Sequence, residues 1–340
     1  MGDIYQSLPK VELHRHLEGS LRLNTMMDVA RAHGITVPSA TGALSNLVQV
    51  QKNEPFTYQN FLAKFNTLRM FYRSPEVIYR VTREAVEDAA ADNVRYLELR
   101  FTPVALSRAE RFPLGDVMDW VCESAGKAGQ EFDIQVGLIA SVNRHESVEL
   151  AEQVAWLAAD HMDRGLLGLD LAGNEAEFPA EPFLGVFKEA HQAGLKLTVH
   201  AGEWGAAANV REALVVLNAD RIGHGVRVME DPETVGLARE RATPFEVCVT
   251  SNHQTGVVKS LQAHPVMNML ESGLYVTLGT DDPSISRICL SDEYRCVCEE
   301  LGMSSEVLHG RILAAAQASF LPNIEKARLT GRLEKELSVN

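Results

Sequence analysis

Residues 10–16, "KVELHRH", form an apolar run that ends in two histidines one residue apart. Successive side chains of a β-strand point to opposite faces, so a strand here would turn His14 and His16 to the same side. Glu18 follows at the same spacing, and Gly19 then interrupts the pattern. The run therefore predicts a strand whose end presents either a pair of metal ligands or two unrelated polar side chains that meet solvent.

Seven further runs along the chain are short, apolar and strand-like. They lie at residues 94–101, 134–142, 166–173, 195–203, 220–225, 245–252 and 274–282. Longer segments with apolar residues three and four positions apart separate them and predict helices. The clearest is residues 74–93, where Ser74 can cap the N-terminus and Pro75 fits the first turn. Segments of the same character lie at residues 113–129, 146–162, 181–194 and 208–218.

This alternation decides the fold class. Strands that alternate with helices build a parallel sheet, and eight such units predict a closed α/β barrel, the (β/α)8 or TIM barrel. We expect a single domain over residues 1–340, with a helical insertion after the first strand and extra helices at the C-terminal end. An open doubly wound sheet is the alternative, but no GxGxxG motif follows the first strand.

The insertion after the first strand contains the aromatic segment "FTYQNFLAKFNTLRMFY" at residues 56–72. Its spacing predicts a helix that carries Phe61 and Phe65. Insertions after barrel strands lie at the catalytic face. This helix is therefore either a hydrophobic lid over the mouth of the active site or a helix packed on the barrel wall.

Composition narrows the class of protein. Of 340 residues, 46% are hydrophobic, which provides a sizeable core and excludes a disordered chain. The net charge of −14 repels phosphate backbones and anionic lipids, so we expect neither nucleic acid nor a membrane as partner. We also expect a cytoplasmic protein, because the sequence has no signal peptide and its five cysteines suit free thiols. The oligomeric state stays open.

Polar residues and glycines gather at the ends of the predicted strands. They are His14, His16, Gly173, Asn174, His200, Glu203, His224, Ser251, Asn252, Asp281 and Asp282. The carboxyl ends of barrel strands meet at one face, where active sites of this architecture lie, so these residues should converge. Histidines together with a carboxylate suit a borderline divalent ion such as Zn²⁺. The sequence therefore predicts a metal site at the carboxyl end of the barrel.

Six motifs, in order along the chain, resemble those of the adenosine deaminase family within the amidohydrolase superfamily. They are "VELHRHLEGS" (11–20), "LDLAGNE" (169–175), "TVHAGE" (198–203), "RIGHG" (221–225), "CVTSNHQTG" (248–256) and "LGTDDP" (278–283). One such motif would be weak evidence, whereas six in the family's order are specific. The resemblance implies a metal-dependent hydrolase with a purine substrate.

The resemblance implies that one Zn²⁺ per chain is bound by His14, His16, His200 and Asp281. Such an ion lowers the pKa of a bound water and so supplies hydroxide near neutral pH. Other amidohydrolases use two metals bridged by a carboxylated lysine after the fourth strand. The fourth strand ends in "LDLAGNE", without a lysine, which favours a single ion.

Two catalytic groups follow from the same resemblance. His224, together with Asp281, is expected to orient the hydroxide and to take up its proton. Glu203 is expected to be protonated and to donate to N1 of the purine, because protonation there opens C6 to attack.

The resemblance also implies substrate contacts. The backbone N–H of Gly173 is expected to meet purine N3, and Asp282 to bind N7. Ser251 matches a serine near the metal-binding carboxylate. Glu18 departs from the family pattern, because adenosine deaminases commonly have Asp there, bound to the ribose 5′-hydroxyl, whereas adenine deaminases often have Glu.

We therefore predict an adenosine deaminase that converts adenosine and deoxyadenosine to inosine and deoxyinosine with release of ammonia. The alternative is a deaminase of adenine or of a modified adenine nucleoside such as aminodeoxyfutalosine or methylthioadenosine. A remote alternative is a non-catalytic purine-binding protein. Loss of Glu203 or of a zinc ligand would have favoured it, and neither is lost.

Overall fold

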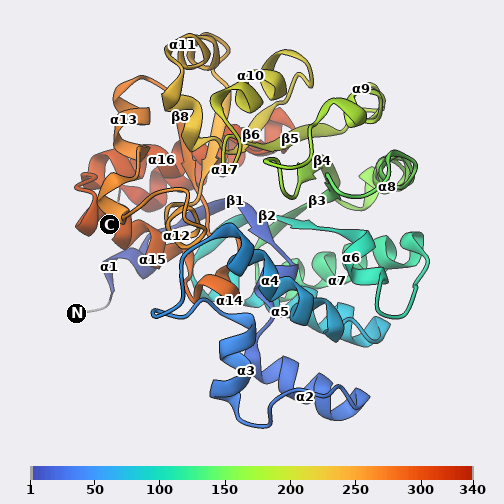
Figure 1. Ribbon diagram of the computed structural model, residues 1–340. Coiled ribbons are helices and arrows are strands. Elements are labelled where there is room, and N and C mark those ends of the chain that lie inside the picture. Colours follow the sequence, from blue (N-terminus) through green and yellow to red (C-terminus); the bar gives the residue numbers. More distant parts are fainter. Residues whose placement is uncertain (1–2, 339–340) are drawn as a thin grey trace.

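The protein is a barrel of eight parallel strands in sequence order, as the computed structural model describes it for residues 3–338 (Figure 1). The strands are β1 (Lys10–His16), β2 (Val94–Phe101), β3 (Gln135–Asn143), β4 (Leu166–Ala172), β5 (Lys196–Ala201), β6 (Arg221–His224), β7 (Pro244–Val247) and β8 (Tyr275–Leu278). Their apolar side chains are almost all buried, which is the pattern of a parallel sheet covered on both faces. The predicted (β/α)8 fold is confirmed.

The barrel closes between β1 and the residues that follow β8. Arg15 and Asp281 form an isolated parallel bridge. In it the N–H of Asp281 donates to the carbonyl oxygen of His14 at 2.9 Å, and the N–H of His16 donates to the carbonyl oxygen of Asp281 at 2.8 Å. The carboxyl end of the barrel is therefore closed by residues of the predicted metal site.

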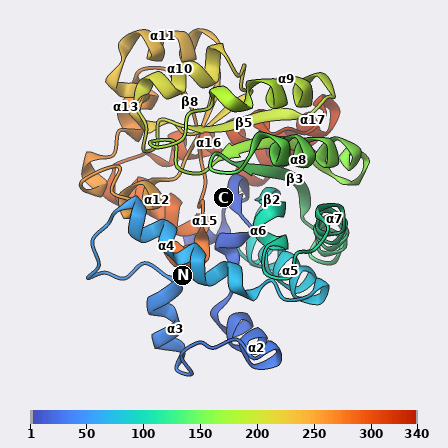
Figure 2. The ribbon, with the colours of Figure 1, turned by 45° about the vertical axis from the view of Figure 1, so that its right-hand side comes forward.

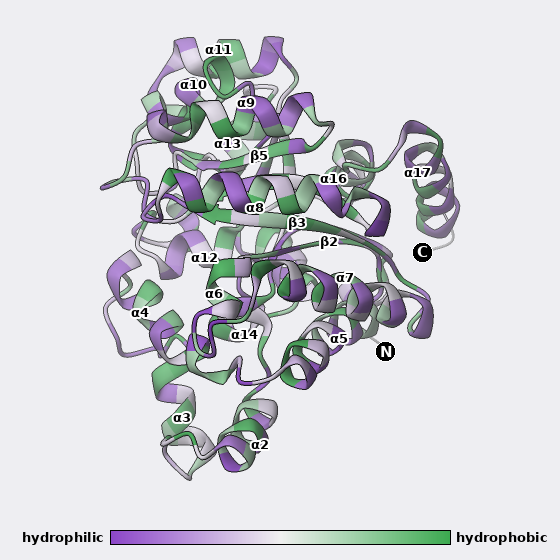
Figure 3. Cartoon of the chain, turned by 90° about the vertical axis from the view of Figure 1, so that its right-hand side faces the viewer, coloured by the Kyte–Doolittle hydropathy of each residue, from purple (hydrophilic) through white to green (hydrophobic). Residues whose placement is uncertain are grey.

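Helices surround the strands on the outside (Figures 1 and 2). Those that connect β2 to β8 include α6 (Pro103–Ser107), α7 (Leu114–Glu131), α8 (Val148–Asp160), α9 (Leu184–Gln192), α10 (Ala207–Val215), α11 (Pro232–Glu240), α12 (Val249–Gln254) and α13 (Val266–Glu271). Hydrophilic and hydrophobic residues alternate along them, as in α8 (Figure 3), because only one face packs on the barrel. In the described part of the chain, no helix is both long enough and apolar enough to cross a membrane.

The insertion between β1 and β2 is helical, as predicted. A short helix, α1 (Ile4–Ser7), precedes β1. The insertion itself contains α2 (Leu23–His33), α3 (Thr41–Val48), α4 (Tyr58–Leu68) and α5 (Pro75–Ala91). Helix α5 starts as the sequence predicts, because Ser74 accepts a hydrogen bond from the N–H of Val77 and Pro75 occupies the first turn. Helices α2 and α3 extend away from the barrel, whereas α4 lies nearer to its centre in the view of Figure 1.

Within residues 3–338, four α-helices follow β8, and a short π-helix (Cys296–Glu300) lies between the second and the third. The α-helices are α14 (Pro283–Ser286), α15 (Leu290–Arg295), α16 (Ser305–Ala318) and α17 (Asn323–Leu337). Helix α16 packs against β8 and β1, and α17 packs on α16 from outside (Figure 3). The expected extra C-terminal helices are therefore confirmed.

Two predicted strand ends are wrong. The seventh strand was expected to run to Asn252, but β7 stops at Val247 and the next residues form α12. The eighth was expected to reach Asp282, but β8 stops at Leu278, and Pro283 starts α14. Short apolar runs fit a strand and a buried helix equally well, so the sequence alone did not separate the strand from the turn that follows it.

Candidate active site

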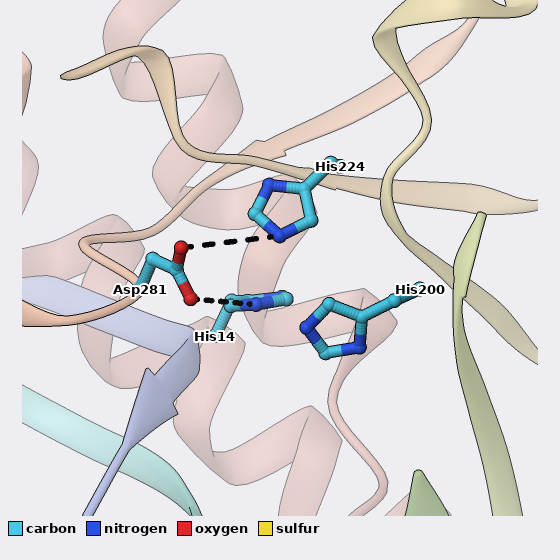
Figure 4. Close-up of side chains that lie close together, drawn as sticks. All are labelled: His14, His200, His224 and Asp281. Atoms are coloured by element: carbon cyan, nitrogen blue, oxygen red, sulfur yellow. Dashed lines mark ion pairs between the residues drawn. The ribbon is translucent and has the colours of Figure 1, made fainter. Parts of the chain in front are cut away.

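The carboxyl end of the barrel brings together four histidines and an aspartate. His14 and His16 come from β1, His200 from β5 and His224 from β6, while Asp281 follows β8. Figure 4 shows His14, His200, His224 and Asp281 turned toward one another. All four are buried, and one ligand atom from each lies within 4.8 Å of the others, so this cluster could hold a metal ion. His16 lies beside it.

Two carboxylates fix the rings of His14 and His200 from behind. His14 Nδ1 lies 2.7 Å from Glu246 Oε2, and His200 Nδ1 lies 2.9 Å from Asp170 Oδ1. A carboxylate accepts the ring N–H, so each Nε2 keeps its lone pair for the centre of the cluster. His14 Nε2 is buried and has no hydrogen-bond partner among the described residues. Burial also lowers the pKa of His200 to about 4, which keeps this ring neutral.

The two carboxylates are themselves held by a buried guanidinium. Arg100 Nη2 lies 2.7 Å from Glu246 Oε2, and its Nη1 lies 3.4 Å from Asp170 Oδ2. Burial alone would raise the pKa of Glu246, but Arg100 and Arg221 hold it well below its usual range. Both carboxylates are therefore ionised and able to orient the histidines.

Distances select four donors among the five. His14 Nε2 and His16 Nε2 lie 3.3 Å and 3.2 Å from Asp281 Oδ1, and His16 Nε2 lies 3.3 Å from His200 Nε2. Tetrahedral ligands about 2.0–2.1 Å from a metal are separated from one another by about 3.3–3.4 Å. His14, His16, His200 and Asp281 are therefore spaced as donors to one metal ion would be.

His224 is placed differently from the other histidines. Asn252 Nδ2 lies 3.1 Å from His224 Nδ1, and Asn252 Oδ1 lies 3.2 Å from His264 Nε2. An amide N–H that donates to Nδ1 leaves the proton of the neutral ring on Nε2. His224 Nε2 is 3.6 Å from Glu203 Oε2 and 4.0 Å from Asp281 Oδ2. This ring therefore presents an N–H toward the two carboxyl groups and is less suited to ligate a metal.

Two of these residues have strained backbones. His224 and Asp281 have φ angles of 57° and 65°, in the left-handed region that residues other than glycine seldom adopt. Such strain costs about 1–3 kcal/mol per residue and is found at functional sites. Ser251 Oγ donates to Asp281 Oδ2 at 2.6 Å and so holds the carboxylate in place.

Glu203 is a buried acid on the turn after β5. Burial raises its pKa well above the usual range, and the negative charges of Asp281, Glu175 and Asp282 raise it further. This environment therefore favours the protonated form of the side chain. It can donate a proton to a molecule bound beside the histidine cluster.

A pocket opens above the cluster and holds about 610 Å³ of space, counted to its open mouth. Besides residues of the cluster, its lining includes Glu18, Phe61, Leu62, Phe65, Arg69, Thr102, Asn143, Gly173, Glu203, Trp204 and Asp282. Phe61, Leu62 and Phe65 belong to α4, so the aromatic insertion contributes an apolar wall.

Two acids at the pocket wall, Glu18 and Asp282, each have a carboxyl oxygen without a hydrogen-bond partner among the described residues. Glu18 Oε1 accepts from the N–H of Thr102 at 2.7 Å, while Glu18 Oε2 and Asp282 Oδ1 are buried without partners among the described residues. Burial raises the pKa of Asp282 well above its usual range, and the charges of Asp281 and Glu18 add to this. Gly173, with φ of 95°, places bare backbone at the same pocket.

Most residues expected at the strand ends lie in the cluster or line the pocket. Ser251 and Asn252 contact the cluster from behind, through Asp281 and His224. Asn174 is not part of the pocket lining, and its side chain accepts from the N–H of Ala176 instead. Sequence reasoning missed Asp170, Glu246 and Arg100 as supports and Trp204 as part of the pocket wall. One signal could have found the three supports. Charged residues in the middle of apolar barrel strands are costly unless they pair with one another.

Comparison with known proteins agrees with this geometry. The family model described as adenosine deaminase matches residues 9–336. An adenosine deaminase of Klebsiella pneumoniae is 36% identical over 98% of this chain and 99% of its own. The structure of adenine deaminase from Arthrobacter aurescens superposes with a TM-score of 0.90, at 28% identity over 97% of this chain and 99% of its own. Arabidopsis ADAL in complex with IMP gives a TM-score of 0.87, at 29% identity over 98% of each chain.

Proposed function

This chain belongs to the adenosine deaminase family, and we propose that it hydrolyses adenosine and deoxyadenosine to inosine and deoxyinosine with release of ammonia. The observation that carries the proposal is the position of Glu203. It is a buried acid whose surroundings raise its pKa, and it lies 3.6 Å from His224 on the wall of the same pocket as the histidine cluster. Hydrolytic deamination of a purine requires an acid that protonates the ring nitrogen, placed beside a metal site that activates water.

We assign one Zn²⁺ to His14, His16, His200 and Asp281. The support is the short separations between their donor atoms and the unpartnered Nε2 of His14. Three neutral imidazoles and one carboxylate are donors that zinc accepts. When bound, the ion would lower the pKa of a water toward neutrality and so provide the nucleophile.

Side chains of the protein, chiefly Glu203 and Asp281, donate and accept the protons of the reaction. Glu203 donates to N1 of the purine, which draws electron density from C6 and makes that carbon open to attack. The Nε2–H of His224 points toward Asp281 Oδ2, so the two groups orient the attacking oxygen and Asp281 takes its proton. The proton passes on to the departing amino group, which leaves as ammonia.

Substrate binding is assigned to three residues. The N–H of Gly173 meets purine N3, protonated Asp282 donates to N7, and Glu18 accepts from the 5′-hydroxyl of the ribose. Phe61 and Phe65 of α4 cover the pocket as an apolar lid that limits water around the bound base.

A second candidate substrate is free adenine. The observation that favours it is Glu18, whose Oε2 is buried at the pocket wall without a partner and could accept from a ring N–H that a nucleoside lacks. The similar structure from Arthrobacter aurescens is of an adenine deaminase. The curated relatives of higher identity are adenosine deaminases, which is why adenosine is placed first.

We propose further that residues 1–340 form one catalytic domain and that the protein is cytoplasmic. Five unpaired thiols suit a reducing compartment. The net charge of −14 disfavours nucleic acid and anionic membranes as partners and leaves a small purine as the binding partner.

The deciding experiment compares kcat/KM for adenosine, deoxyadenosine, adenine and 5′-modified adenosines in one assay of ammonia release. We expect adenosine and deoxyadenosine to exceed adenine by at least about 10-fold, a difference of about 1.4 kcal/mol. A faster reaction with adenine would replace the first candidate by the second. No release of ammonia from any of them would refute deamination.

A further inference from the structure

The carboxylate of Glu175 lies beneath the turn that carries Glu203. Its Oε2 accepts from the N–H of Gly202 at 2.9 Å, and its Oε1 accepts from the N–H groups of Glu203 at 2.6 Å and Trp204 at 2.7 Å. Glu175 follows β4, has only 5% of its surface exposed, and does not line the pocket. One buried side chain thus satisfies three successive backbone donors.

The turn is shaped to receive this carboxylate. Successive N–H groups that converge in a turn form a concave anion-binding nest. Gly202 has a φ of 70°, which a side chain would strain. A Cβ on Gly205 would lie 2.7 Å from Glu175 Oε2, so the absence of a side chain there leaves room for the acid.

These hydrogen bonds fix the backbone of Glu203 and therefore the origin of its side chain. The backbone N–H of Glu203 makes the shortest of the three hydrogen bonds, and charge-assisted bonds of this kind are about twice as strong as neutral ones. The Glu203 carboxyl group then lies 3.6 Å from His224. Small displacements of a proton donor reduce turnover steeply, because transfer needs heavy atoms about 2.6–3.2 Å apart.

We propose that Glu175 is the positioning residue of Glu203: by holding the N–H groups of residues 202–204, it aims the proton donor at the purine ring. The proposal rests on the proposed function, in which Glu203 protonates N1. Glu175 itself touches no substrate. A residue that merely kept the turn folded would affect the whole pocket and would act independently of Glu203.

A double-mutant cycle separates these two roles. The variants are Glu175→Gln, Glu203→Gln and the combination, with Glu177→Gln as control because Glu177 is exposed on the same loop. A glutamine has the size of glutamate but offers one oxygen, and its NH₂ faces backbone N–H groups. We expect Glu175→Gln to lower kcat at least about 10-fold with KM within about threefold, and the control to match the wild type.

The combined variant decides the mechanism. If Glu175 acts through Glu203, adding Glu175→Gln to Glu203→Gln should change kcat by less than about twofold. Multiplicative losses, or an unchanged kcat in Glu175→Gln, would overturn the positioning role. Full activity of Glu203→Gln alone would refute the proposed function and the positioning role with it, so the two failures are distinguishable.

A second variant guards against misfolding of Glu175→Gln. Gly205→Ala keeps the carboxylate but places a methyl group 2.7 Å from its Oε2 and 2.7 Å from Asn209 Nδ2, and it should give the same loss in kcat. Metal content and melting temperature are measured for every variant, and both should match the wild type. A Gly205→Ala protein with normal kcat would contradict the proposal.

Discussion

The backbone N–H of Asp281 donates a hydrogen bond to the carbonyl oxygen of His14 at 2.9 Å. Asp281 follows the last strand, β8, and His14 lies in the first, β1, so this bond closes the barrel between these two strands. The side chains of the two residues meet as well, with His14 Nε2 3.3 Å from Asp281 Oδ1. Closure of the barrel and assembly of the candidate metal site are therefore the same structural event.

We expect elemental analysis to find one Zn²⁺ per active chain, and metal removal to lower the melting temperature. A ligand that binds only the folded state stabilises it, by an amount that grows with the logarithm of the free ligand concentration relative to its Kd. His14→Ala should lose most of the metal, whereas His33→Ala, which changes an exposed histidine, should keep it. Two ions per active chain, or none, would contradict the assignment.

Glu203→Gln should keep its metal and lose at least about 10²-fold in kcat, because the amide has no acidic proton to give. Since burial raises the pKa of Glu203, wild-type turnover should be complete below this raised pKa and fall as pH rises through it, at a higher pH than for an ordinary glutamate. Metal analysis and a pH–rate profile test both statements. Turnover by the variant at the wild-type rate would remove Glu203 from the mechanism.

Glu18→Ala should lower kcat/KM for adenosine by about 1–3 kcal/mol, the cost of losing one hydrogen bond to a charged group. The same substitution should affect 5′-deoxyadenosine much less, because that compound lacks the hydroxyl. Steady-state kinetics with both compounds checks this. An equal loss for the two would show that Glu18 does not read the 5′-position.

Gly19→Ala should disable the site without unfolding the protein. A Cβ on Gly19 would lie 1.8 Å from Asp282 Oδ1 and 2.5 Å from Asp282 Cβ, so Asp282 would have to move, backbone included. A displacement of about 1 Å at a binding group can cost about 10²-fold in rate, and we expect kcat/KM to fall at least about 10-fold. Gly236→Ala, on the open surface of α11, is the control and should be normal.

Glu293→Gln should change how stability depends on pH. Glu293 is buried in α15, accepts from the N–H of Thr250 at 2.9 Å, and has a pKa raised by burial to about 8. Its proton is held in the folded state, so its contribution to stability is complete below the unfolded pKa of about 4.5 and is lost as pH rises through 8. Between pH 5 and pH 8 this loss amounts to about 3 kcal/mol in the wild type.

Urea unfolding at pH 5 and pH 8 measures this difference. The Glu293→Gln variant should lack this part of the decline, while Glu240→Gln, at an exposed position, should keep it. Parallel behaviour of wild type and Glu293→Gln across this range would refute the protonated state of Glu293.

The sequence by itself determined the barrel and the convergence of the site. Apolar runs alternating with amphipathic segments predicted eight strands and their helices, because burial on both faces leaves a periodic record in the chain. The position of His14, His200, His224 and Asp281 at the ends of these runs then predicted that they would meet. Both inferences need only local pattern and the rule that parallel strands end at one face.

Only the tertiary structure decided what holds the site and how it is oriented. Three features depend on where side chains distant in sequence point. They are the hydrogen bonds of Glu246 and Asp170 to the histidines, the position of the proton on His224, and the hydrogen bonds of Glu175 to the turn of Glu203. The ends of β7 and β8 predicted from the sequence were wrong for the same reason. Whether Val249 continues a strand or starts α12 is decided by packing at the barrel mouth, and not by its apolar character.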